Sequence, residues 1–267
     1  MSLRKKSIGF PDPLLGSNPI RLDIIDNTKY WIAINKPSNI ASRQHLWNKG
    51  YNNLDSALNF QLKQRKPEIV SLNADKFSSI YNLDYLISGI ALYSKSHESL
   101  NFLRNAFGSD QISFNYYFVA KNLKKDFNSR LVEFPLKAHK NKCRMIPSKK
   151  GKNSHTKFIR LKDGIDNWSL FEAKTNYFRP HQIRIHASLI GLQIMNEPIY
   201  NGIKAPTLAM LGKSKKTSDI STNIFSDLAL HLGSIKFPSI LDQKKIIEIQ
   251  APISKSLKTV YKYLKLL

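Results

Sequence analysis

The amino-acid sequence predicts an α+β fold, in which strands are mixed with occasional helices and do not alternate strictly with them. Runs rich in aromatic and β-branched residues, such as Ile112 to Ala120, have the composition of β-strands. Helical spacing of apolar side chains occurs between such runs, for example at Leu54, Ala57, Leu58 and Leu62. A chain of 267 residues, 42% of them hydrophobic, can bury a substantial core as one large domain.

The N-terminal half combines a loose beginning with regular elements. Prolines, glycines and serines over residues 1–20 predict a flexible N-terminal arm, followed by a folded domain over residues 21–267. Pro37 ends the second expected strand because proline cannot donate a hydrogen bond to a sheet. The elements expected in this half are strands at 21–25, 30–34 and 90–93, and helices at 53–64 and 98–107.

The C-terminal half begins with a strongly β-type run at 112–120. A hairpin is expected next, and a basic helix follows it and ends at Gly191, because glycine is favoured just past a helix end. Residues 200–223 are polar and rich in lysine, which predicts a long surface excursion. The remaining elements expected here are hairpin strands at 158–161 and 168–173, strands at 228–232 and 246–249, and a helix at 255–267.

Positive charge dominates the composition. The chain has 42 Lys and Arg residues against 19 Asp and Glu, which gives a formal net charge of +23. Such a surplus opposes compaction unless a polyanion neutralises it, so nucleic acid is the favoured partner. An anionic membrane is the competing explanation, but it calls for a basic amphipathic helix or a lipidation signal, and neither stands out.

Several other classes of protein are disfavoured. No apolar run approaches the roughly 20 residues of a membrane-spanning helix. The basic start of the chain has no apolar stretch after it, so a secretory signal is not expected. Cys143 is the single cysteine, which excludes an intramolecular disulfide and a zinc site built from several cysteines. We therefore expect a monomer in the reducing cytoplasm, without a metal and without a place in a membrane.

Basic residues cluster in the middle of the chain. On their own they are typical of a solvated hairpin, but the global charge favours contact with phosphates. Such contacts would bind RNA without a sequence preference. The cluster consists of Lys137, Lys140, Lys142, Arg144, Lys149, Lys150 and Lys152.

The segment Phe178–Gly191 is the most distinctive stretch. It places two arginines and two histidines in the opening turns of an expected helix. His181 and Arg184 occupy neighbouring positions of one helix face, three residues apart. Together with Arg179 and the amide groups of the helix start, they predict an anion-binding surface. A solvated basic helix is the simpler interpretation of this segment taken alone.

The order of three segments resembles the RluA-type pseudouridine synthases. That family has His-Arg-Leu-Asp-x-x-Thr-Ser-Gly, then Lys-x-Tyr-x-Ala, then Gly-Arg-Thr-His-Gln-Ile-Arg-x-His. Here Tyr81–Ile90, Asn115–Val119 and Arg179–His186 follow in the same order. The resemblance covers about residues 20–267. It extends to Ile34-Asn-Lys-Pro37, Glu197-Pro-Ile-Tyr200, Leu228-Ala-Leu-His231 and Ala251-Pro252.

The resemblance implies a pseudouridine-synthase-like fold, with a mixed, largely antiparallel sheet, flanking helices and a central RNA-binding cleft. It implies conversion of uridine to pseudouridine in ribosomal or transfer RNA, with no cofactor and no metal. By position, Asp84 matches the catalytic aspartate and Arg184 the arginine that keeps this carboxylate ionised. Tyr117 matches the tyrosine that stacks on the base, with Tyr116 as the one-position alternative. The expected RNA-binding residues are Lys36, Asn82, Lys140, Lys142, Arg144, Arg179 and His181.

The sequence also departs from the family pattern. Asn82 stands where the family has an arginine that holds RNA open around the flipped nucleotide, so another basic residue or an already open loop is expected to compensate. Tyr81, Ile87 and Phe178 replace a histidine, a threonine and a glycine. Two alternatives to an active enzyme follow: a catalytically inactive RNA-binding paralogue, and a ribosome-associated factor without base chemistry.

Overall fold

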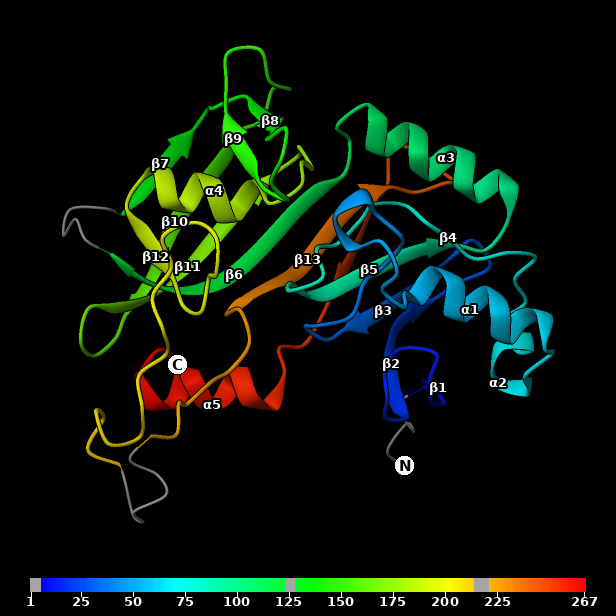
Figure 1. The fold of residues 1–267 in the computed structure, drawn as a ribbon. Coiled ribbons are helices and arrows are strands. Elements are labelled where there is room, and N and C mark those ends of the chain that lie inside the picture. Colours follow the sequence, from blue (N-terminus) through cyan, green and yellow to red (C-terminus); the bar gives the residue numbers. More distant parts are fainter. Residues whose placement is uncertain (1–5, 123–127, 214–220) are drawn as a thin grey trace. The chain divides into compact units, whose positions relative to one another are not determined.

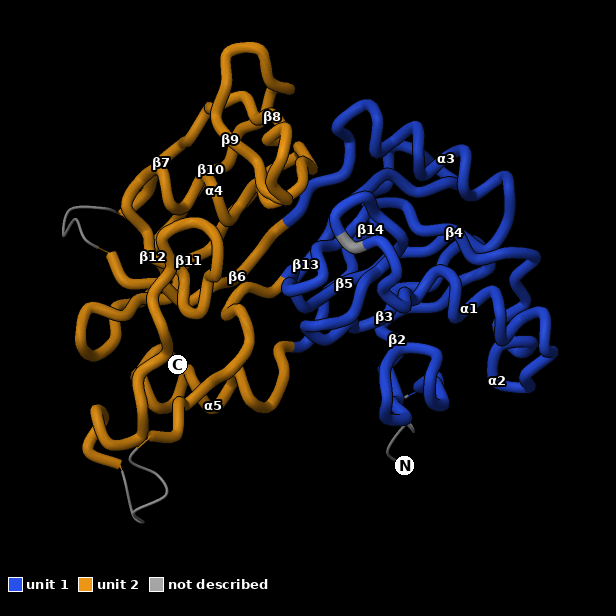
Figure 2. The backbone as a smooth tube through the Cα atoms, in the orientation of Figure 1, with its two compact units in different colours: residues 1–114, 232–252 blue, residues 115–231, 253–267 orange. Residues whose placement is uncertain are grey.

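The computed structural model describes residues 6–122, 128–213 and 221–267 (Figure 1). Its strands pair mostly antiparallel, and the described residues include five α-helices, which confirms the predicted α+β class. Two compact units divide the chain, and each consists of two separate stretches of sequence (Figure 2). Unit 1 comprises Met1–Phe114 and Leu232–Pro252, and unit 2 comprises Asn115–His231 and Ile253–Leu267.

Unit 1 is built on strands in the order β1-β2-β3-β5-β13, with β4 also paired to β5 and β14 to β13. The helices α1 and α2 contribute Leu54, Leu58 and Ile69 to its hydrophobic core. The strands are β1 (Ser7–Phe10), β2 (Ile20–Asn27), β3 (Trp31–Lys36), β4 (Ser78–Ser79), β5 (Ser88–Ser94), β13 (Leu230–Pro238) and β14 (Ile246–Gln250). The helices are η1 (Leu46–Asn48, a 3-10 helix), α1 (Leu54–Lys63), α2 (Pro67–Val70) and α3 (His97–Gly108).

The start of the chain differs from the flexible arm expected over residues 1–20. Strand β1 pairs antiparallel with β2, and it buries Ile8 and Phe10 in the core of unit 1. These two side chains are spaced by two residues, so one face of the strand buries both of them. The prolines and glycines around this short strand conceal it in the sequence.

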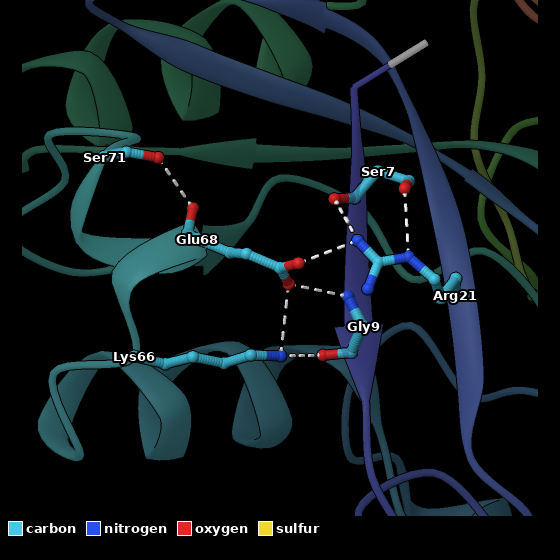
Figure 3. Close-up of polar contacts among 6 residues, drawn as sticks. All are labelled: Ser7, Gly9, Arg21, Lys66, Glu68 and Ser71. Atoms are coloured by element: carbon cyan, nitrogen blue, oxygen red, sulfur yellow. Dashed lines mark hydrogen bonds and ion pairs between the residues drawn. The ribbon is translucent and has the colours of Figure 1, made fainter. Parts of the chain in front are cut away.

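A polar network ties β1 to α2 (Figure 3). The Glu68 carboxylate accepts a hydrogen bond from the Gly9 amide at 3.1 Å and another from the Arg21 guanidinium at 2.7 Å. The Lys66 ammonium lies 3.3 Å from the same carboxylate and donates to the Gly9 carbonyl. These partners lower the pKa of Glu68 to about 2, with the Arg21 hydrogen bond as the largest cause.

Unit 2 is built on strands in the order β6-β11-β10-β7, with β12 paired to β6. Strands β8 and β9 form a separate hairpin. Helix α5 packs Leu257, Val260 and Tyr261 into the core of the unit, to which Trp168 also belongs. The strands are β6 (Ser113–Asn122), β7 (Ser129–Val132), β8 (Leu136–Ala138), β9 (Met145–Pro147), β10 (Thr156–Asp163), β11 (Trp168–Thr175) and β12 (Leu192–Ile194). The helices are α4 (Gln182–Leu189) and α5 (Lys255–Tyr263).

The longer elements lie where the sequence predicts them, and the shortest were missed. The hairpin of β10 and β11 is antiparallel as expected. Strands of two to four residues, such as β4, β7, β8, β9 and β12, carry too few side chains to show a period. Within the expected excursion at 200–223, residues 214–220 lie outside the described part of the chain. No helix in the described ranges is both long and apolar enough to cross a membrane.

Candidate active-site residues

Asp84 lies in the turn between β4 and β5, and it is partly exposed. Its side chain folds back on the turn, where Oδ1 accepts a hydrogen bond from the Leu86 amide at 3.0 Å. Its carbonyl accepts another from the Ile87 amide at 3.1 Å. Gly89 follows with φ +120°, and a side chain there would clash with the Leu232 backbone. This close approach of β5 and β13 explains why glycine stands so near the aspartate.

Lys36 is a buried residue that contacts the turn containing Asp84. Its side chain is 0% exposed, and its ammonium donates to the carbonyls of Pro37 at 2.9 Å and Ile40 at 2.8 Å. It also lies 3.4 Å from the carbonyl of Tyr85, which accepts a hydrogen bond from the Asn39 amide. Burial lowers the pKa of Lys36 to about 7, and the charge of Asp84 opposes this shift. The placement differs from the expected RNA contact, because a fully buried ammonium cannot reach a phosphate.

Asn82 lies two residues before Asp84 and is half-buried. Its Oδ1 lies 3.0 Å from the Ser42 hydroxyl, which is also 3.0 Å from the Leu83 carbonyl. The loop after β3 is thereby held against this position. It brings His45 near Asp84: burial and the charge of Arg43 lower the pKa of His45, while Asp84 opposes that shift. Sequence reasoning missed both basic residues, because no motif marks the loop.

Tyr117 lies on β6 with its side chain half-buried, whereas Tyr116 is 4% exposed within the core. This alternation places the two phenols on opposite faces of the strand. Asn115 donates to the Tyr117 hydroxyl at 3.1 Å and to the carboxylate of Glu172 on β11 at 2.8 Å. Burial, then the charge of Glu172, raises the pKa of Tyr117, while Asn115 and Lys174 oppose the shift. Glu172 is thus part of the tyrosine's surroundings, which the sequence did not indicate.

Arg184 lies on α4 and forms a buried, two-pronged ion pair with Glu197. Arg184 Nε is 2.6 Å from Oε2 of the Glu197 carboxylate, and Arg184 Nη2 is 2.8 Å from Oε1. The side chains are only 1% and 0% exposed. The same carboxylate accepts hydrogen bonds from the amides of Ile199 and Tyr200. Glu197 therefore fixes both the guanidinium and the turn that carries Tyr200, a role that its motif did not reveal.

Helix α4 begins later than expected. His181 is its N-cap and has a left-handed backbone with φ 54°, so Arg179 lies before the helix. His181 Nδ1 is 2.9 Å from the Tyr200 hydroxyl, and the Arg184 guanidinium lies over the Tyr200 ring, 5.6 Å from its centroid. Arg179 is half-buried and donates to the Asn153 carbonyl at 3.1 Å. His181 and Arg184 therefore share Tyr200 as a partner.

His186 has a structural place in unit 2. It is fully buried, with Nδ1 2.9 Å from the Thr156 hydroxyl and Nε2 3.0 Å from the Phe134 carbonyl. Burial lowers its pKa to about 4, so the ring is neutral near pH 7. This histidine joins α4 to β10 and is unavailable for binding an anion.

The basic cluster of the middle of the chain lies on and around the β8–β9 hairpin. Lys140 and Lys142 are exposed in its loop, and Arg144 is half-buried. The other lysines of the cluster, Lys137, Lys149, Lys150 and Lys152, are exposed as well. Exposed ammonium groups of this kind can contact phosphates without removal of any protein partner.

The expected site residues belong to both compact units. Asp84, Asn82 and Lys36 belong to unit 1, while Tyr117, Arg184 and His181 belong to unit 2. Among the described residues, no group of three or more His, Cys, Asp or Glu side chains could hold a metal ion. The functional side chains that the geometry offers are therefore a carboxylate, a phenol, a buried guanidinium and many exposed cations.

Comparison with known sequences identifies the family of this chain. Residues 30–189 match the RNA pseudouridylate synthase family, and the chain belongs to it. The chain is similar to an uncharacterized RNA pseudouridine synthase of Mycoplasma pneumoniae, 26% identical over 204 residues, which cover 75% of this chain and 62% of that relative. It is also similar to ribosomal large subunit pseudouridine synthase C of Buchnera aphidicola, 29% identical over 245 residues, 90% of this chain and 70% of the relative.

Solved structures show the same fold. Human RNA pseudouridylate synthase domain containing 4 superposes with a TM-score of 0.66 at 14% identity, covering 91% of this chain and 92% of that one. Human RNA pseudouridylate synthase domain containing 1 gives a TM-score of 0.60 at 18% identity, over 87% and 83% of the two chains. This similarity confirms the predicted pseudouridine-synthase-like architecture.

Proposed function

We propose that this chain is an RNA pseudouridine synthase that isomerises uridine to pseudouridine in ribosomal or transfer RNA, with residues 21–267 as the catalytic domain. Family membership supports the reaction class. The names of relatives that act on the large ribosomal subunit favour ribosomal RNA. The observation that carries the proposal is the Asp84 turn, in which a partly exposed carboxylate is held by its own backbone and by the buried Lys36 beneath it.

In the proposed reaction, Asp84 acts as the ionised carboxylate that attacks the nucleotide or stabilises developing charge. The bond between the ribose and the uracil nitrogen breaks, the base turns, and a bond from the ribose to a uracil carbon forms. The proton on that carbon leaves and the uracil nitrogen freed from the ribose takes up a proton, while Asp84, if it has bonded to the nucleotide, is released as the carboxylate. Tyr117 is assigned to stack on the base and to take part in removal of the carbon-bound proton. Product and substrate have the same atoms, so the chemistry calls for no redox partner and no group donor.

The remaining assignments divide into supporting and binding roles. Arg184 takes the role of the family's arginine, as the match of its motif implies, and Glu197 holds its guanidinium in one orientation. Lys36 holds the Asp84 turn. Arg43 supplies the positive charge that Asn82 lacks beside the flipped nucleotide, and the His45 imidazole lies in the same loop. The RNA backbone is bound by Lys140, Lys142, Arg144, Arg179 and His181 in the cleft of a cytoplasmic monomer.

The test is loss of isomerisation in Asp84→Asn. We expect tritium release from RNA with tritium at uracil C5 to fall at least on the order of a thousandfold, the scale of removing a nucleophile. Asp75→Asn is the matched control, because it makes the same charge change at an exposed site of the same unit. Unchanged turnover in Asp84→Asn would overturn the assignment. RNA binding by a wild-type protein that makes no pseudouridine would favour the inactive paralogue instead.

A further inference from the structure

Helix α5 presents a line of lysines whose arrangement does not stabilise the helix. Lys255, Lys258 and Lys262 are all exposed. They are spaced by three and four residues and therefore lie on one face, where like charges destabilise a helix. Lys255 also lies in the first turn, where the positive end of the helix dipole disfavours a cation. We call these three residues the α5 lysine face.

Two other helices, α1 and α3, follow the opposite rule. α1 has Asp55 in its first turn and Lys63 in its last, and α3 has Glu98 in its first turn. By contrast, residues 249–267 contain no acidic residue at all. Lys262 lies in the last turn, where the dipole favours a cation, but Lys255 and the repulsion along the face oppose stability. A local arrangement that lowers stability is typical of a functional surface.

Among the described residues, the surroundings of the face add positive charge and offer no neutralising partner. Within the described part of the chain, the three ammonium groups make no hydrogen bond or ion pair. Lys213 is exposed and lies against the same helix, with its ammonium 4.5 Å from the centre of the Tyr263 ring. The face is therefore a local concentration of cations, with Lys213 at its C-terminal end.

The opposite face of α5 decides between a membrane and RNA as the partner. A helix that lies in a membrane interface inserts its apolar side chains into the lipid. In α5 those side chains, Leu257, Val260 and Tyr261, are already buried in the core of unit 2. Only the lysine face is free to bind, and it offers charge without apolar surface. This combination suits phosphates.

We propose that the α5 lysine face is a second phosphate-binding surface for the substrate RNA, separate from the residues of the reaction site. Lys255 and Lys262 are seven residues apart, so the face extends about 10 Å along the helix. A double helix carries one phosphate charge about every 1.7 Å of its axis, so each lysine can meet a phosphate. The face binds backbone without reading sequence, and it would select RNA large enough to reach it from the reacting uridine.

The proposal rests on the proposed function only for the identity of the RNA. Its test is the triple variant Lys255→Gln, Lys258→Gln and Lys262→Gln, measured by RNA-binding titrations at several salt concentrations with a structured ribosomal RNA fragment. The slope of log affinity against log salt should fall by about 2–3, since each lost contact contributes about 0.7–0.9. Urea unfolding should show equal or greater stability, because repulsion and the unfavourable dipole contact are removed.

The control makes the same change of net charge elsewhere. Lys63→Gln, Lys236→Gln and Lys244→Gln replace three exposed lysines of unit 1 and should leave the slope nearly unchanged. Equal slopes for the two triple variants, or a wild-type slope in the α5 variant, would overturn the proposal. So would loss of binding to anionic lipid vesicles without loss of binding to RNA.

Isomerisation at saturating RNA separates this proposal from the proposed function. The α5 variant should keep the wild-type rate, because its lysines lie outside the proposed reaction machinery. If the wild type makes no pseudouridine while the slope still falls only in the α5 variant, the proposed function fails and the lysine face stands. If the wild type is active and the slopes agree, the lysine face alone fails.

Discussion

The buried ion pair of Arg184 and Glu197 allows the contribution of one guanidinium to the free energy of unfolding to be measured. Arg184→Met leaves a carboxylate without its cation in a dry environment, and we expect a loss of about 3–5 kcal/mol in the free energy of unfolding. Adding Glu197→Leu should recover much of that loss, because the isolated charge is then removed. Urea unfolding of the two single variants and the double variant measures the coupling. A stability of Arg184→Met equal to the wild type would contradict the pairing.

The effect of the Glu172 carboxylate on the pKa of Tyr117 can be tested by mutation. Glu172 is a cause of the raised pKa of Tyr117, so Glu172→Gln should lower that pKa. Spectrophotometric titration of the phenolate should then show one tyrosine ionising at lower pH, and Tyr117→Phe in each background identifies it. Glu248→Gln, on a strand of unit 1, is the control for the charge change. An unchanged titration would separate Glu172 from Tyr117.

At the scale of elements, Glu68 joins β1 to α2, and its contribution depends on pH. Its pKa is about 2 in the folded protein against an ordinary value of 4.5, so folding favours the ionised form. The stabilisation is fully present above pH of about 5 and is lost as the pH falls toward 2. Because the Glu68 side chain is 37% exposed, solvent screening limits its worth to about 1 kcal/mol.

We therefore expect Glu68→Gln to be less stable than the wild type at neutral pH and equal to it near pH 2, with urea unfolding as the measurement. Glu248→Gln provides a comparison, since Glu248 is an exposed carboxylate with an ion pair to Lys236 at 3.0 Å and no bond to β1. Its effect should be smaller. A constant difference between Glu68→Gln and wild type across this pH range would show that the ionised carboxylate is not the cause.

The sequence predicts elements well where many side chains repeat a pattern. β2, β3, α1, α3, β6 and the β10–β11 hairpin all carry enough apolar positions to define their period. β1 was missed because four residues followed by two prolines carry almost no periodic signal. The predicted start of α4 was too early because His181 has a left-handed backbone, and this conformation is set by the folded structure and not by the residue type.

The sequence predicts the motif residues of the candidate site better than it predicts the residues that contact them. Asp84, Tyr117 and Arg184 are marked by the residues around them in the sequence. Their partners are not, because they come from elsewhere in the chain: Glu172 lies 57 residues from Asn115, and Glu197 lies 13 residues from Arg184. Lys36 shows the converse problem, since a lysine in a motif suggests contact with RNA while the fold buries it completely.

For the whole molecule, the net charge of +23 couples stability and binding to ionic strength in opposite senses. Salt screens the repulsion among exposed cations, so the free energy of unfolding should rise between about 0.05 and 0.5 M KCl. Over the same range, affinity for RNA should fall steeply, because bound cations and phosphates exchange with salt ions. Urea unfolding and RNA titrations in the same buffers measure both. Stability that falls with salt would show that attractive pairs outweigh the repulsion.

The division of each unit into two stretches of sequence has a consequence for synthesis on the ribosome. The chain passes from one unit to the other after Phe114, after His231 and after Pro252. While the first 231 residues emerge, unit 1 still lacks β14 and most of β13, and unit 2 lacks α5 with its three buried core side chains. Neither unit can finish folding before the last of these segments leaves the exit tunnel. A nascent chain stalled before residue 232 should therefore remain open to proteases and in need of chaperones.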